Sequence, residues 1–128
     1  HVIQVLTEAG IPSVLLDIDL VSAGQKFSNQ ERFENCDIRD KAALKEVFTN
    51  HLFEGVIHLV ALKSVEESQT MQREYFETNV VGTQNILDVM LDFHVDKIIF
   101  SSLGSARKTK GFKIIVESIS RLKNNNLF

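Results

Sequence analysis

Residues 56–61 read Val-Ile-His-Leu-Val-Ala, and this stretch decides the fold class of the chain. The run is too short for a typical helix, and its nearly unbroken apolarity suits a parallel strand buried on both faces better than a half-exposed strand. We expect the histidine within it, His58, to be a hydrogen-bonded core residue rather than a ligand. The stretch therefore predicts a central strand of an α/β sheet.

Three other segments predict strands around this one. Residues 13–17 (SVLLD) form a short apolar run that ends in an acid, and residues 18–31 after it have the Ser, Gly, Asn and Gln content of a loop. Residues 32–37 (RFENCD) could form another short strand, and residues 96–102 (DKIIFSS) form an apolar run that ends in hydroxyls.

The segments between the strands have helical spacing. Residues 1–9 are followed by Gly10, a common residue just past a helix end, and Asp40 is suited to cap a helix over 41–50. A long helical stretch is expected over 70–93, although Gly82 lies inside it. The apolar positions expected to face inward in these last two helices are Leu44, Val47, Phe48, Tyr75, Val80, Ile86, Leu87, Met90 and Leu91.

Strands that alternate with helices predict right-handed crossovers and a parallel sheet, in which ligands lie beyond the carboxyl ends of the strands. In this chain those ends are Asp17, Asp37, the loop at 60–64 and the hydroxyls of Ser101 and Ser102. A ligand site is therefore expected at that edge.

Charge and cysteine content exclude several classes of function. The formal net charge is −3, with 14 basic and 17 acidic residues, so no basic footprint for nucleic acid or an anionic membrane surface is expected. A single cysteine, Cys36, and the absence of a long apolar run favour a cytoplasmic setting without a membrane span. The histidines and Cys36 have no metal-ligand spacing, so no metal site is expected.

Several segments are similar to one protein family. Residues 56–65 (VIHLVALKSV) are similar to V-I-H-F-A-A/G-L-K-x-V, and residues 79–83 (NVVGT) to N-V-x-G-T. Residues 37–40 (DIRD) and 100–102 (FSS) agree as well. In this order, over His1 to Ser102, the chain resembles the extended short-chain dehydrogenase/reductases, and within them the UDP-glucose 4-epimerases. The resemblance implies a partial Rossmann-like NAD-binding fold and, for the family, interconversion of UDP-glucose and UDP-galactose.

The resemblance also implies an NAD site. The family acid corresponding to Asp17 binds the adenosine ribose hydroxyls, a role that suits an ionised carboxylate because it only accepts hydrogen bonds. The residues corresponding to Asp37 and Ile38 contact the adenine. Lys63 corresponds to a lysine that reaches the cofactor as a cationic donor. The implied cofactor-binding set is Asp17, Asp37, Ile38, Leu59, Lys63 and Asn79. Without the family pattern, the acids and the lysine would be ordinary loop residues, and the asparagine a helix or cap residue.

Family groups needed for catalysis are not found in these 128 residues. The family's first strand and G-x-x-G-x-x-G turn hold the pyrophosphate, and no three of the six glycines have that spacing. Family proton transfer uses Tyr-x-x-x-Lys, whereas the single tyrosine, Tyr75, is followed four residues later by Asn79. Leu103 occupies the position where the family has a serine after its fifth strand, although Ser105 is close to that position in the sequence. We therefore expect no catalytic residue and no epimerase activity.

Cofactor binding is expected to be weak and adenosine-like. Val60 stands where the family usually has alanine beside the cofactor, and Glu66 replaces a family glycine, so both positions are bulkier. The alternative function is a non-enzymatic interaction module that pairs with a full-length homologue through the helix at 79–93, as family dimers do. For that helix we expect a charged, solvated face rather than a pairing surface. An unstable product without a role is the third reading.

The chain is expected to divide into a partial NAD-binding domain over 1–103 and a divergent tail over 104–128. In the family's sheet order, the absent first strand lies between the strands matching 13–17 and 56–61, so a gap with two apolar edges is expected there. Residues 112–116 (FKIIV) could fill it as a strand, but we expect a helix over 112–122. An open gap would make the domain poorly cooperative or prone to self-association.

Overall fold

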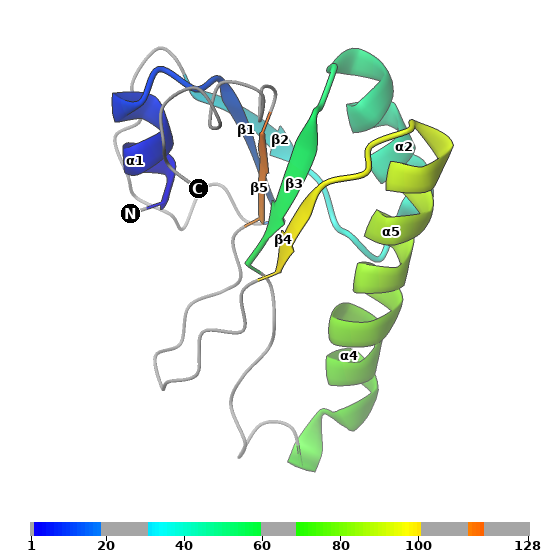
Figure 1. Ribbon diagram of the computed structural model, residues 1–128. Coiled ribbons are helices and arrows are strands. Elements are labelled where there is room, and N and C mark those ends of the chain that lie inside the picture. Colours follow the sequence, from blue (N-terminus) through cyan, green and yellow to red (C-terminus); the bar gives the residue numbers. More distant parts are fainter. Residues whose placement is uncertain (1, 19–30, 60–68, 101–112, 117–128) are drawn as a thin grey trace.

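The computed structural model describes residues 2–18, 31–59, 69–100 and 113–116, which form an α/β fold with helices on both faces of one sheet (Figure 1). The elements are α1 (Val2–Glu8), β1 (Ser13–Asp17), β2 (Glu31–Asn35), α2 (Lys41–Asn50), β3 (Gly55–His58), α4 (Gln72–Phe76), the π-helix η1 (Glu77–Val81), α5 (Gly82–Asp92), β4 (Ile98–Phe100) and β5 (Lys113–Val116). The strand order is β2-β1-β5-β3-β4. The predicted fold class is confirmed.

Strand β5 fills the slot between β1 and β3. β1 pairs with β2 and β3 pairs with β4, both in parallel, whereas β5 runs antiparallel to β1 and β3. Leu15 and Ile57 both pair with Ile114. The expected helix over 112–122 is therefore wrong at 113–116. The physical reason is that β1 and β3 have unpaired main-chain groups on facing edges, and an extended β-branched run satisfies both edges at once.

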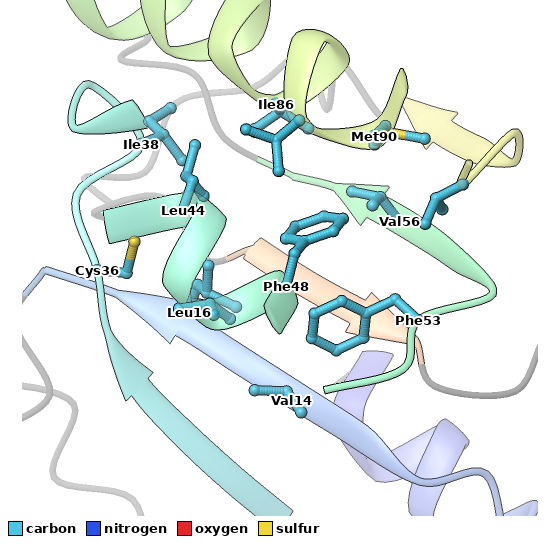
Figure 2. Packing of buried hydrophobic residues seen from close by; sticks show 13 residues of the cluster. Val14, Leu16, Cys36, Ile38, Leu44, Phe48, Phe53, Val56, Ile86 and Met90 are labelled. Atoms are coloured by element: carbon cyan, nitrogen blue, oxygen red, sulfur yellow. The ribbon is translucent and has the colours of Figure 1, made fainter. Parts of the chain in front are cut away.

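Strands β1 and β3 are buried on both faces of the sheet, as the apolar run at 56–61 predicted for β3. All residues of β1 and β3 are buried. Val14, Leu16 and Val56 pack on the side of α2 and α5, as Figure 2 shows, whereas Leu15 and Ile57 pack on the other side, with α1. This arrangement explains why β1 and β3 lack the alternation of a half-exposed strand.

The larger core lies between the sheet and the pair of helices α2 and α5. Asp40 caps α2 as predicted, because its carboxylate accepts a hydrogen bond from the amide of Ala43 at 3.0 Å. The ring of Phe48 meets that of Phe53 edge-on, with 4.9 Å between the ring centroids (Figure 2). The ring of Phe93 is tilted against Phe48, with 5.6 Å between the centroids. The buried members of this core are Val14, Leu16, Cys36, Ile38, Leu44, Val47, Phe48, Phe53, Val56, Ile86, Val89, Met90 and Val95.

The smaller core lies under α1. Leu6, Ile11, Leu15 and Ile57 are buried there. Gly10 has a φ of 69° just after the helix, which is the left-handed conformation that ends many helices and that glycine adopts most easily. The predicted helix over 1–9 and its end are confirmed.

The expected helix over 70–93 is divided by the π-helix η1. Ile86 and Met90 are buried as predicted, but Val80, Leu87 and Leu91 are 51%, 38% and 74% exposed, so their assignment to the core is wrong. In a π-helical turn the main-chain hydrogen bonds join residues five apart instead of four. Apolar residues that are spaced 3 and 4 apart therefore do not stay on the same side of the helix when the turn lies between them.

No helix in the described part of the chain is long and apolar enough to cross a membrane.

Candidate functional site

The carboxyl ends of β1 and β2 bring two of the predicted site residues to one edge of the sheet. Asp17 ends β1 and is paired in register with Asn35, the last residue of β2. The amide of Cys36 donates to the main-chain oxygen of Asp17 at 3.1 Å, so the chain leading to Asp37 begins beside Asp17. Asp17 is only 4% exposed. The two strand ends lie at the same edge, as the sequence predicted, because β1 and β2 pair in parallel.

The carboxylate of Asp37 is held by Arg39. The main-chain amide and Nε of Arg39 donate to Oδ1 at 2.9 and 3.1 Å, and Nε and Nη2 donate to Oδ2 at 3.0 and 2.7 Å. The hydrogen bond and the charge of Asp37 raise the pKa of the Arg39 guanidinium above its usual value, and the more distant charges of Glu74 and Glu77 add to this against a small effect of burial. Both side chains keep about a third of their surface exposed, at 36% and 32%.

Ile38 anchors this loop to α5. Its side chain is 2% exposed and lies against Gly82, at the first turn of α5. The side-chain amide of Asn85 donates to the carbonyl oxygens of Ile38 and Arg39 at 2.9 and 3.0 Å. The Ile38 side chain therefore belongs to the core.

The other predicted site residues lie on different elements. Leu59, just after β3, is partly buried against the smaller core. Asn79 lies in the π-helix η1, and its main-chain oxygen accepts a hydrogen bond from Oγ1 of Thr83 at 2.8 Å. Lys63 and the hydroxyls of Ser101 and Ser102 fall outside the described residues.

A buried polar chain connects β3 to η1. His58 is fully buried, and its Nε2 lies 2.8 Å from Oγ1 of Thr83. The Thr83 hydroxyl donates its proton to the oxygen of Asn79, so it accepts the hydrogen bond from Nε2–H of His58. The expectation of a hydrogen-bonded core histidine is confirmed. The role of Thr83 was missed, and the signal for it was its position four residues after Asn79 in the N-V-x-G-T segment.

Metal-ligand side chains do not gather in the described ranges, where no group of three His, Cys, Asp or Glu residues could hold an ion. The charged groups that the structure describes at the carboxyl ends of β1 and β2 include two acids and the arginine that holds one of them. This chemistry suits hydrogen-bond donors such as hydroxyls and amines.

The sequence of this chain is similar to those of known proteins. Residues 1–106 match the NAD dependent epimerase/dehydratase family. The UDP-glucose 4-epimerase of Yersinia enterocolitica is 36% identical over 109 residues, covering 80% of this chain and 32% of that protein. The enzyme of the same name from Halalkalibacterium halodurans is 38% identical over 102 residues, covering 80% of this chain and 30% of that protein.

Solved structures agree in fold. A crystal structure of UDP-glucose 4-epimerase matches with a TM-score of 0.70 and 37% identity, over 77% of this chain and 30% of that one. A Bifidobacterium longum UDP-glucose 4-epimerase in complex with NAD+ and UDP matches with a TM-score of 0.53 and 39% identity, over 56% of this chain and 22% of that one.

The chain spans about a third of the length of these two curated relatives. The match over residues 1–106 includes every predicted cofactor-binding position. The chain belongs to the NAD dependent epimerase/dehydratase family.

Proposed function

We propose that this chain binds the adenosine half of NAD, as part of a nucleotide-sugar epimerase of the UDP-glucose 4-epimerase type. The observation that carries the proposal is the pair of acids at the carboxyl ends of adjacent parallel strands, with Asp17 at the end of β1 and Asp37 two residues beyond β2. Parallel α/β sheets bind ligands at this edge. The relatives of the same name, and the NAD+ held by one of the solved structures, support the cofactor.

The proposed roles follow from the chemistry of the groups. Asp17 would accept hydrogen bonds from the ribose hydroxyls, and Asp37 with the main chain of Ile38 would contact the adenine. Leu59 would line the cofactor and Asn79 would support it from η1. Lys63 would supply a cationic donor. UDP-sugar is the proposed substrate class of the whole family protein.

The fit to NAD is partial. The acids suit the hydroxyls and amine of adenosine, but these 128 residues contain no G-x-x-G-x-x-G, whose amides would hold the pyrophosphate. When bound, NAD supplies the hydride acceptor of an epimerase. The proton partner of that step, Tyr-x-x-x-Lys, is also not found in this sequence. We therefore propose weak, adenosine-like binding and no epimerase turnover by this chain.

Calorimetric titration tests the binding. We expect NAD and adenosine to bind with similar, weak affinity, and Asp17→Asn to weaken both, because a neutral amide is a weaker acceptor than a carboxylate. Asp96→Asn, which changes an exposed acid just before β4, is the matched control and should have no effect. Micromolar or tighter binding of NAD, clearly better than that of adenosine, would reveal a phosphate site and contradict the proposal.

A coupled assay tests the proposal that this chain does not turn over UDP-sugars as an epimerase. With UDP-galactose, NAD and the purified chain, we expect no UDP-glucose above the protein-free control, because neither proton transfer nor sugar binding has its family residues. Turnover that persists after repurification would show that other groups of this chain carry the proton.

A second candidate function is pairing with a homologue through the 79–93 helix. The specific observation is an apolar stripe on α5, where Leu87 and Leu91, four residues apart on one helix face, are 38% and 74% exposed. Phe76 and Val80, which lie before and within the π-helix η1, are also exposed, at 60% and 51%. Apolar stripes of this kind favour helix pairing.

Sedimentation velocity tests the pairing. Replacing Leu87 and Leu91 with glutamate should abolish association, whereas Leu52→Glu should leave it unchanged, because Leu52 is 89% exposed but lies after α2, away from the stripe. A wild-type chain that stays monomeric alone and with a full-length homologue would remove this candidate.

A further inference from the structure

Residues 72–92 form one helical rod in which a π-turn separates two α-helical parts, α4 and α5 (Figure 1). The π-turn is η1, and the amide of Gly82 just after it donates to the carbonyl oxygen of Glu77, five residues earlier. An α-helix would instead join Gly82 to Thr78. π-turns are rare in proteins, so one that persists has neighbouring contacts that offset its cost.

The part of the rod after η1 is anchored to the rest of the fold. Residues 37–40 form a turn, which is closed by a main-chain hydrogen bond of 3.0 Å from the amide of its last residue to the oxygen of its first. Gly82 lies against the buried side chain of Ile38 in this turn. The side-chain amide of Asn85 donates to the carbonyl oxygens of Ile38 and Arg39 at 2.9 and 3.0 Å. The first turn of α5 is therefore fixed on the 37–40 turn.

The part of the rod before η1 lies at the surface. None of the five residues of α4 and the five residues of η1 is buried. The side of this part that faces the 37–40 turn is acidic, because the charges of Glu74 and Glu77 act on the guanidinium of Arg39. A rotation of α4 about its own axis would therefore remove no buried side chain from the core.

A chain of two hydrogen bonds from the sheet enters the rod at η1. Nε2–H of His58, which is fully buried in β3, donates to the hydroxyl of Thr83 at 2.8 Å. That hydroxyl donates to the carbonyl oxygen of Asn79, in the middle of η1, at 2.8 Å. Because Thr83 belongs to the anchored part and Asn79 to the π-turn, these two bonds connect the π-turn to the sheet.

A hydroxyl bond of the same kind occurs elsewhere in the chain without a π-turn. Oγ1 of Thr49 donates to the carbonyl oxygen of Lys45 at 2.8 Å, and α2 is α-helical at both residues. Thr49 is exposed, whereas Thr83 is held from β3 by His58. The bond from a hydroxyl to a carbonyl four residues earlier is therefore not sufficient for a π-turn. What distinguishes η1 is the additional contact from the sheet.

The form of η1 decides which face of α4 meets the 37–40 turn. A π-turn takes up about one residue more than an α-turn, and each residue of an α-helix turns the chain by about 100°. With α5 fixed, an α-helical η1 would give each residue of α4 the direction of the residue before it. Glu74 would take the direction of Arg73, whose side chain is 91% exposed. Phe76 would take the direction of the half-buried Tyr75.

We propose that His58 and Thr83 form a register lock, which consists of the bond from His58 to Thr83 and the bond from Thr83 to Asn79. The lock holds η1 in its π form and so keeps the acidic side of α4 on the 37–40 turn. It is a conformational device in which α5 is the fixed part and α4 is the part that turns. It goes beyond the proposed function and does not depend on which ligand binds at the strand edge.

Scalar couplings across hydrogen bonds, measured by NMR, identify the acceptor of each amide. In the wild-type chain the amide of Gly82 should couple to the carbonyl carbon of Glu77. Thr83→Val keeps the shape of a half-buried side chain but removes its hydroxyl, so the coupling of Gly82 should move to Thr78. Thr83→Ser keeps a hydroxyl and should keep the wild-type coupling.

Substitutions at the other end of the lock and in α2 complete this experiment. His58→Leu should move the coupling in the same way as Thr83→Val, whereas His58→Gln keeps an N–H donor and should not. Thr49→Val is the matched control, because it removes the same kind of hydroxyl bond from an ordinary α-helix. This control should leave the couplings of η1 unchanged.

Relaxation of side-chain protons by a soluble paramagnetic agent measures the rotation of α4. In Thr83→Val, the protons of Glu74 should relax faster because this side chain turns toward solvent. The ring protons of Phe76 should relax more slowly because this ring turns toward the body of the fold. Thr83→Ser and Thr49→Val should match the wild type at both side chains.

Three outcomes would overturn the inference. The first is a Thr83→Val chain that keeps the coupling from Gly82 to Glu77. The second is a moved coupling that Thr49→Val reproduces, since the contact from the sheet would then not be the cause. The third is a moved coupling without any change in the relaxation of Glu74 and Phe76, because α4 would not have turned. Binding of adenosine is measured separately, so the proposed function stands or falls on its own.

Discussion

Gly82 is the residue at which α5 comes closest to the loop after β2. A Cβ placed there would lie 2.6 Å from Cγ1 of Ile38 and closer still to its Cδ1. Ile38 is 2% exposed within the larger core, so its side chain has little room to move away. The absence of a side chain at Gly82 is therefore what allows Ile38 to pack and the 37–40 turn to sit on the helix.

We expect Gly82→Ala to destabilise the fold despite the better helix propensity of alanine. Overpacking costs about 1–3 kcal/mol, whereas alanine gains about 1 kcal/mol over glycine in a helix, so a net loss of about 1 kcal/mol is expected. In an Ile38→Ala background the clash is gone, and the same substitution should then stabilise. Urea unfolding of the four variants measures this change of sign. A loss of equal size in both backgrounds would contradict the packing argument.

At the scale of elements, α2 and α5 are joined by ion pairs as well as by the core. Nζ of Lys41 lies 2.7 Å from Oδ2 of Asp88, and Nζ of Lys45 lies 2.8 Å from Oδ2 of Asp92. Hydrogen bonds from Lys41 and then Gln84 lower the pKa of Asp88 below its ordinary value of 3.8, with a small opposing effect of desolvation. Asp88 is thus stabilised in its ionised form by the neighbouring helix.

The lowered pKa predicts how this contact depends on pH. A carboxylate with a lower pKa in the folded state contributes stability above the unfolded pKa and loses it as the pH falls through the folded pKa. We expect Asp88→Asn to lower the urea midpoint slightly at neutral pH and to match the wild type well below pH 3.8. Asp96→Asn provides a control outside the α2–α5 contact. A difference that persists unchanged at the lowest pH would disprove the assignment.

At the scale of the whole molecule, β5 determines whether the sheet is continuous. It pairs with β1 on one side and with β3 on the other, so it connects the parallel pair β1–β2 to the parallel pair β3–β4 (Figure 1). Without it, two fully buried apolar strands would face each other across a gap. Exposed edges of that kind invite pairing with other chains.

We expect Ile114→Pro to open the sheet, because proline lacks the amide that a central strand needs. Ile114 pairs with both Leu15 and Ile57, so the substitution should remove a large part of the ~5–15 kcal/mol typical of a domain and promote self-association. Ile114→Val is the control, since it keeps the amide and β-branching. Sedimentation velocity with urea unfolding provides the measurement. A monomeric proline variant with an unchanged midpoint would show that β5 is dispensable.

Much of the fold was predictable because its signals are local. The short apolar run at 56–61 indicated a strand buried on both faces, and Asp40 with the 41–50 spacing indicated a capped helix, since capping and periodicity involve neighbours in the sequence. The placement of Asp17 and Asp37 at one edge followed from the same reading, because parallel strands end together. The ligand roles of these residues remain predictions.

The sequence by itself determined the α/β class, the helix after Asp40 and the family motifs at 37–40, 56–65 and 79–83. Only the tertiary structure decided that Lys113–Val116 is a strand, because this β-branched run has the periodicity of either element and the open slot between β1 and β3 selects the extended form. It also decided the π-turn at Glu77–Val81 and the bond from His58 to Thr83. The β5 pairings and the His58–Thr83 bond join groups far apart in the chain, and local spacing carries no information about which of them meet.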